Sequence, residues 1–366
     1  MWDSKNLLYI LSSIENSKFS NSIRKITLFF VGYILICFLI SILWQSTTNL
    51  NNWSLNHPLL LGNENTGDRP WNGYIAKIQI ADRAFSQSQV SQLLDNKSNL
   101  DTTQKHWLAD YKLTNNNIFQ DITGQTPELL PQESLSNIKD VKDEKGVILS
   151  PGHWFKTQTP PTLLNKRIRK TSELTVFTTV ATSNTNQTGP ARIISLSRNP
   201  LNRNFTLGQQ KTNLSLRIRT SITGENGAHI ELNVSSIFTD TNFHNIIITY
   251  SKATVHVYID QLKNSYSFNL LELIPREQKI VYYGLTFIPL GIYLGFLSIL
   301  IKKRYTFNRL LLLFAIILPS LILEIVLVMY SGKSFSLGDL IFGALITGVT
   351  MLILKLRASR LFKQQI

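Results

Sequence analysis

Four long apolar runs and one long region of alternating residues divide this chain of 366 residues. Each apolar run is long enough, at about 1.5 Å per helical residue, to cross a hydrocarbon core of about 30 Å. The pattern therefore predicts four transmembrane helices, which form one α-helical membrane domain. Glu324 and Asp339 are the only charged residues within the runs, which are 26–45, 281–301, 310–330 and 337–354.

Residues 46–280, between the first and second apolar runs, alternate instead between apolar and polar side chains. A period of two predicts strands with one buried face, and regularly spaced strands separated by Gly, Asn, Ser and Thr predict an antiparallel β-sandwich. Short helices are expected at 86–95 and 134–145. The strands with the clearest alternation are 191–197, 204–208, 214–220, 229–234, 244–250 and 254–260. We therefore expect a multi-domain protein, part α-helical and part all-β.

Basic residues gather in the segments 1–25, 302–309 and 355–366, which flank the apolar runs. These three segments contain only two acidic residues, Asp3 and Glu15. The positive-inside rule places all three in the cytoplasm, so the region 46–280 and the turn 331–336 are expected outside. Because the basic segments supply much of the net charge of +14, the partner that they indicate is the lipid bilayer and not nucleic acid.

The single cysteine, Cys37, lies in the first apolar run, so no disulfide is expected in the region 46–280. The first run is too long for the apolar core of a signal peptide and lacks a small-residue cleavage site, which indicates a retained anchor. We expect a multi-pass protein of a bacterial inner membrane. Both termini would be cytoplasmic, and the sandwich external or periplasmic.

Several stretches of the central region resemble concanavalin A-like and laminin G-like domains. Residues 243–263 are similar to the strand–hairpin–strand of these domains, with His244 opening one strand and Asp260 at the turn that closes the next. Residues 189–220 resemble the middle of the family, and 106–131 resemble its opening, with a turn from Asp121 to Gly124.

Residues 71–90 resemble the last strands of that family, but in this chain they come first. The resemblance therefore implies a circularly permuted jelly-roll sandwich, an arrangement that neighbouring chain ends tolerate. The alternative is that 59–85 form a separate hairpin lid.

Sandwiches of this kind often hold calcium through loop oxygens. The candidate calcium ligands are Asp121, Asn63, Glu64 and Asp68; for Asp121 the alternative is a cap on its own turn. Trp71, Trp107 and Trp154 are candidates for stacking on sugar rings, with core packing as the alternative. Catalysis is not favoured here, because no strand carries the alternate carboxylates that glycosidases use and the histidines lack metal-ligand spacing.

The C-terminal apolar runs resemble VanZ-like membrane proteins. FIPLGIYLG at 287–295 is similar to their second helix, and 318–348 resemble their signature of Pro319, Glu324, a loop with Lys333, and Asp339 opening a Gly-containing helix. Lys333 stands where the family often has Arg, and part of the family's polar set is absent. The resemblance implies a four-helix VanZ-like core with the sandwich inserted between its first two helices.

Two functions remain open from the sequence. The first is a non-enzymatic cell-envelope protein whose lectin-like sandwich binds glycan or a protein partner. The alternative is a membrane-embedded enzyme or lipid-handling protein that uses Glu324, Asp339 and Lys333 in an outward-facing polar pocket, because carboxylates at membrane depth are costly. A structural explanation is that Asp339 is stabilised by the helix dipole and that Glu324 pairs with Lys333.

Overall fold

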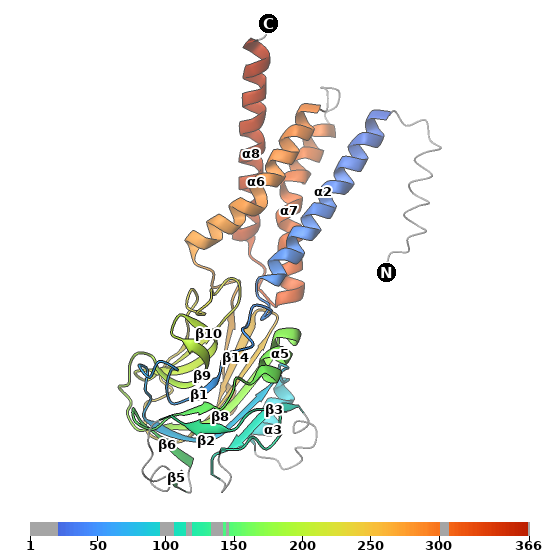
Figure 1. Ribbon diagram of the computed structural model, residues 1–366. Helices are drawn as coiled ribbons and strands as arrows, with labels where there is room; N and C mark the ends of the chain where they lie inside the picture. The colour runs from blue at the N-terminus through green and yellow to red at the C-terminus, as the bar shows by residue number, and fades with distance from the viewer. Residues whose placement is uncertain are drawn as a thin grey trace. The chain divides into compact units, whose positions relative to one another are not determined.

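The computed structural model describes residues 21–95, 106–114, 119–132, 142–143, 146–300 and 307–364 (Figure 1). The chain divides into two compact units. The helical unit comprises Met1–Trp44, Arg276–Met329 and Ser334–Ile366, and the sandwich unit comprises Gln45–Pro275 and Tyr330–Lys333.

The described part of the helical unit is built from α2 (Asn21–Ser46), α6 (Arg276–Leu300), α7 (Phe307–Ser331) and α8 (Leu337–Gln364). Three stretches are long and apolar enough to cross a membrane, which supports three of the four predicted spans: Arg276–Phe296, Leu312–Ser331 and Leu337–Ala358. The apolar part of α2 found by the same criterion, Val31–Trp44, is shorter. The first span therefore stays a prediction.

Close packing within the helical unit depends on small residues. A Cβ atom at Gly343 of α8 would lie 2.7 Å from the Phe287 ring of α6 and 2.9 Å from Ser320 of α7. Only glycine lets these three helices approach so closely. Helix α2 is joined to α7 by the Tyr33 hydroxyl, which donates to the carbonyl of Ala315 at 3.1 Å.

The sandwich unit contains a seven-stranded and an eight-stranded antiparallel sheet, so the predicted all-β domain is confirmed. The seven-stranded sheet has the order β12 (Leu232–Val234), β11 (Asn213–Ile218), β10 (Asn202–Gln210), β9 (Ala191–Asn199), β1 (Leu59–Leu61), β7 (Phe155–Thr157), β4 (Leu129–Pro131). In the eight-stranded sheet β3 (Trp107–Lys112) pairs with β2, and the remaining order is β15 (Gln261–Asn269), β14 (Thr254–Ile259), β13 (His244–Ser251), β8 (Leu174–Thr182), β2 (Gly73–Ala81), β6 (Gly146–Leu149), β5 (Lys142–Asp143).

The six alternating segments predicted as strands overlap with β9 to β14, but the segment predicted at 229–234 is a strand only over Leu232–Val234. Helix α3 (Gln87–Leu94) confirms the helix expected at 86–95, and it begins with a capping box between Ser86 and Gln89. Helix α5 (Thr162–Thr171) was not expected from the sequence. The helix expected at 134–145 lies outside the described residues except for Lys142–Asp143, which form β5.

The segment that contains β1 and β2 lies in the middle of both sheets. Strand β1 pairs with β9 and β7, with Leu61 opposite Ile194. Strand β2 pairs with β8 on one side, and β6 and β3 also pair with it. The alternative of a separate hairpin lid at 59–85 is therefore wrong, because these residues form interior strands and Leu59, Leu60 and Leu61 are fully buried.

Candidate functional site

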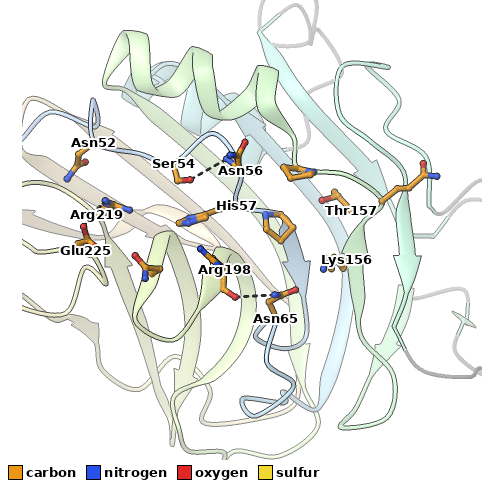
Figure 2. A pocket seen from close by; sticks show the side chains of 14 residues that line it. Asn52, Ser54, Asn56, His57, Asn65, Lys156, Thr157, Arg198, Arg219 and Glu225 are labelled. Atoms are coloured by element: carbon orange, nitrogen blue, oxygen red, sulfur yellow. Dashed lines mark hydrogen bonds and ion pairs between the residues drawn. The ribbon is translucent and has the colours of Figure 1, made fainter.

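A polar pocket of about 630 Å³ lies in the sandwich unit, at one end of the seven-stranded sheet (Figure 2). Its walls come from the segment before β1, from β7, from the hairpin between β9 and β10, and from the loop after β11. Cavities of this size suit small ligands or one to a few sugar units. The charged residues that line it are Lys156, Arg198, Arg219 and Glu225.

The lining carries more positive than negative charge. Arg219 Nη2 lies 3.5 Å from Glu225 Oε1, but the Glu225 side chain is 71% exposed, so water screens this pair. Lys156 and Arg198 have no ion-pair partner among the described residues. With one carboxylate against three cations, the pocket is suited to an anionic ligand.

His57 is buried in the middle of this lining, and Figure 2 shows its ring between Arg219 and Arg198. Burial, followed by the charges of Arg219 and Arg198, lowers the pKa of His57 to about 4. The imidazole is therefore neutral at pH 7. Its Nδ1 is buried and has no hydrogen-bond partner among the described residues.

Two buried asparagines hold the loop that carries His57. Asn204 exchanges two hydrogen bonds with Ser54, each 2.8 Å long, through its side-chain oxygen and nitrogen. Asn165 of α5 donates to the carbonyls of Leu55 and His57, both at 3.1 Å. The loop is thus fixed from β10 on one side and from α5 on the other, which pre-organises the pocket.

The candidate calcium ligands do not fit a calcium site. Both carboxylate oxygens of Asp121 already accept hydrogen bonds, from the backbone nitrogens of Asp110, Thr123, Gln125 and Thr126 and from the Thr123 hydroxyl. This is the turn-capping role that was the alternative for Asp121. Among the described residues no group of three or more His, Cys, Asp or Glu side chains is placed to hold a metal ion.

The other three candidate ligands lie together in the loop after β1 but bond within the protein. Asn63 Oδ1 accepts from the backbone nitrogens of Glu64 and Arg69 at 2.8 and 2.9 Å. Asp68 accepts from Thr66. The fully buried Glu64 faces Arg192, with Glu64 Oε2 3.6 Å from Arg192 Nε. The positive charge of Arg192 would repel a calcium ion bound at Glu64.

The three candidate tryptophans are buried and do not line the pocket. Trp71 donates to Gln209 Oε1 at 2.8 Å, and Trp107 packs against Phe85 with the ring centroids 4.9 Å apart. Trp154 is 7% exposed. Stacking on a sugar needs an exposed ring face, which none of these side chains offers.

In the helical unit, Glu324 and Asp339 are both buried and both bonded near the start of α8. Glu324 Oε1 accepts from the backbone nitrogen of Ser336 at 2.6 Å, and Asp339 Oδ1 lies 2.5 Å from Lys279 Nζ. Lys333 is buried in the segment grouped with the sandwich unit. The sequence did not indicate Lys279 as the partner of Asp339, because the predicted span began at Val281 whereas α6 begins at Arg276.

No protein-family model, curated protein or solved structure matches the chain. The resemblances to VanZ-like and laminin G-like proteins therefore stay predictions. The sequence reasoning also missed the pocket around His57. Its residues come from separate segments, and no single segment carries a recognisable motif.

Proposed function

We propose that the protein is a membrane-anchored, non-enzymatic binding protein of the cell envelope, whose sandwich holds an anionic glycan in the pocket around His57. The observation that carries the proposal is the lining of this pocket, in which three cations and a neutral imidazole face one exposed carboxylate. Side-chain amides complete the lining at Asn52, Asn56, Asn65, Gln158 and Asn202.

These residue types match the chemistry of an acidic sugar. An amide side chain both donates and accepts hydrogen bonds, as a sugar hydroxyl does, and guanidinium groups bind carboxylate or phosphate. Glycoside hydrolysis needs two carboxylates on either side of the scissile bond. Among the residues that line the pocket Glu225 is the only carboxylate, which favours binding over cleavage.

The proposal extends to the placement of the protein. Three apolar helices of sufficient length support a membrane protein. We infer from the basic segments that it lies in a bacterial inner membrane with cytoplasmic termini and an external sandwich. The interior position of β1 and β2 supports a permuted jelly roll of the laminin G-like type. We propose the VanZ-like helical core from the sequence resemblance alone.

Binding of matched oligosaccharides to the full chain in detergent tests this function. We expect an acidic oligosaccharide, such as oligogalacturonate, to bind at least 10-fold more tightly than a neutral galactose oligomer of equal length. The variant Arg198→Gln should reduce that binding, whereas Arg169→Gln on the exposed face of α5 should leave it unchanged. Equal binding of the acidic and neutral oligomers would contradict the proposal. Because the candidate calcium ligands bond within the protein, we expect the same oligosaccharide binding in the presence of calcium and of a chelator.

A second candidate function is favoured by the Lys279–Asp339 pair, since an ion pair in an apolar helical unit is costly to bury. The function would be an enzyme or lipid-handling protein acting through Glu324 and Asp339. Both carboxylates, however, have partners within the protein, because Glu324 accepts from the backbone nitrogen of Ser336 and Asp339 pairs with Lys279. These partners account for them structurally. A lipid-modifying activity lost in Glu324→Gln with α8 intact would favour this candidate.

A further inference from the structure

Four arginines gather around the polar face of the seven-stranded sheet. Arg192 of β9, Arg203 of β10 and Arg217 of β11 come from three neighbouring strands, and Arg69 comes from the loop after β1. The cross-strand register places Arg203 opposite Ser197 and Arg217 opposite Thr206. We call these four residues the arginine cluster.

Three members of the arginine cluster have a carboxylate partner. Arg69 Nε lies 3.6 Å from Asp68, Arg192 Nε lies 3.6 Å from Glu64, and Arg217 Nη2 lies 2.6 Å from Glu231. No carboxylate among the described residues forms an ion pair with Arg203, although Glu64 and Glu231 lie near enough to favour its charge. The cluster therefore has one positive charge more than its partners neutralise.

Arg203 is also the member whose hydrogen bonding is least complete. It is 2% exposed and donates from Nη2 to the carbonyl of Pro200, while its Nε and Nη1 have no hydrogen-bond partner among the described residues. A buried guanidinium with incomplete hydrogen bonding is costly, so negative charge brought near Arg203 would stabilise it. Burial, followed by the charge of Arg217, lowers the pKa of Arg203 to about 10.

Arg217 connects the buried cluster to solvent. It lines a groove of about 390 Å³ together with Glu231, Ser215 and Asn233. The Arg217 side chain is 14% exposed and the Glu231 side chain 50% exposed. Because the Glu231 carboxylate is half in water, an anion that enters the groove can replace it against Arg217 at little cost.

We propose that the arginine cluster is a binding site for a phosphate monoester, which takes the position of the Glu231 carboxylate against Arg217 and neutralises Arg203. The charges match. With Glu231 displaced, Arg203 and Arg217 leave two positive charges uncompensated, and a phosphate monoester carries about −1.5 to −2 at pH 7. A carboxylate or a phosphodiester supplies only one negative charge. Bidentate contacts from arginine are also the geometry that phosphate oxygens accept best.

This site is separate from the pocket around His57. None of the four arginines lines that pocket, and none of the pocket's charged residues lines the groove beside Arg217. The two proposals can therefore fail independently.

The test is calorimetric titration of the full chain in detergent at constant ionic strength. The probes are inorganic phosphate, glucose 6-phosphate, glucose and sulfate, so that free and ester-bound phosphate are distinguished. We expect phosphate and glucose 6-phosphate to bind and glucose not to bind. Arg217→Gln should weaken binding at least 10-fold. Glu231→Gln, which removes the competing carboxylate, should leave binding unchanged or strengthen it.

The control variant is Arg169→Gln, on the exposed face of α5, which belongs to neither site and should not alter phosphate binding. Arg198→Gln reports separately on the pocket around His57. Loss of binding in Arg198→Gln but not in Arg217→Gln would overturn the site and place the anion in the pocket. Absence of phosphate binding in the unmodified protein would also overturn it. If Arg217→Gln fails to fold, the Glu231→Gln variant provides the test. Weaker phosphate binding by Glu231→Gln would contradict the proposal that phosphate displaces the Glu231 carboxylate.

Discussion

His244 Nδ1 lies 2.8 Å from Asp260 Oδ2, which joins the first residue of β13 to the residue that follows β14. The other Asp260 oxygen accepts from the backbone nitrogen of Asn245 at 2.7 Å. Asp260 has a φ of 59°, a conformation that Asp and Asn tolerate better than most residues. The pair therefore fixes the open end of the β13–β14 hairpin in register.

Replacing Asp260 by alanine should destabilise the sandwich. The variant loses two hydrogen bonds and keeps an unfavourable positive φ, which together cost about 1 to 3 kcal/mol of unfolding free energy. Asp260→Asn keeps both the accepting oxygen and the tolerance for this φ, so it should lose less. Thermal unfolding of the full chain in detergent measures the difference. Equal losses in the two variants would show that neither feature matters.

Stability should fall in acid because of His57. The pKa of His57 is about 4 in the folded protein and about 6.5 in an unfolded chain. Between these values the unfolded state binds more protons, so stability decreases as the pH falls from about 6.5 to about 4. The total loss is about 3 kcal/mol. Above pH 6.5 the residue contributes no pH dependence, since it is neutral in both states.

The variant His57→Gln isolates this effect. Unfolding free energies of the variant and the unmodified protein, measured from pH 4 to pH 7.5, should diverge in slope only below about pH 6.5. Parallel curves across the whole range would mean that His57 is not buried as a neutral group.

Glu64→Gln should be among the most destabilising single changes in the loop after β1. The substitution leaves the guanidinium of Arg192, which is 2% exposed, without its counter-charge, and breaking a buried pair costs about 3 to 5 kcal/mol. Asp68→Asn, in the same loop but half exposed, serves as the control and should cost under about 1 kcal/mol. Both effects should be the same with calcium and with chelator. A Glu64 effect that appears only with calcium would restore the metal site.

In the helical unit, Gly343→Leu should disrupt packing. A side chain there meets Phe287 and Ser320 at distances that no Cβ atom occupies, and overpacking costs about 1 to 3 kcal/mol or more. Gly338→Ala is the matched control, because its nearest neighbour is the Ser336 hydroxyl at 3.8 Å. Size-exclusion profiles and thermal midpoints in detergent compare the two. A monodisperse, equally stable Gly343→Leu protein would contradict the packing.

The strands could be predicted because apolar and polar residues alternate along much of β9 to β14, and alternate residues of a strand point to opposite faces. The structure buries both faces of β9 and β10. Helix α5 was missed because it is short and polar. Only Leu164 and Ile168, one turn apart, mark its buried face together with Asn165. The pairing of β1 with β9 was not predictable, since three consecutive leucines carry no information about their neighbours.

The pocket and the arginine cluster are products of tertiary structure. His57, Lys156, Arg198 and Arg219 come from four separate segments, and each on its own reads as an ordinary surface residue. The arginines of β9 to β11 likewise come from three different strands, and only the sheet brings them together. The sequence does single out Glu324 and Asp339, because an apolar run makes a charge conspicuous; the structure buries both. The outward-facing polar pocket stays a prediction.

The interior position of β1 and β2 has a consequence for the order of folding. These strands are synthesised before most of the domain. The partners of β1, which are β7 and β9, and the partner β8 of β2 all follow after residue 154, and Leu61 pairs with Ile194. Contacts between residues so far apart in sequence form slowly, because a long loop must close first. During synthesis β1 therefore stays unpaired, whereas β2 can pair early with β3 and β6 but lacks β8 on its other edge. Neither sheet can be completed until its C-terminal half has emerged.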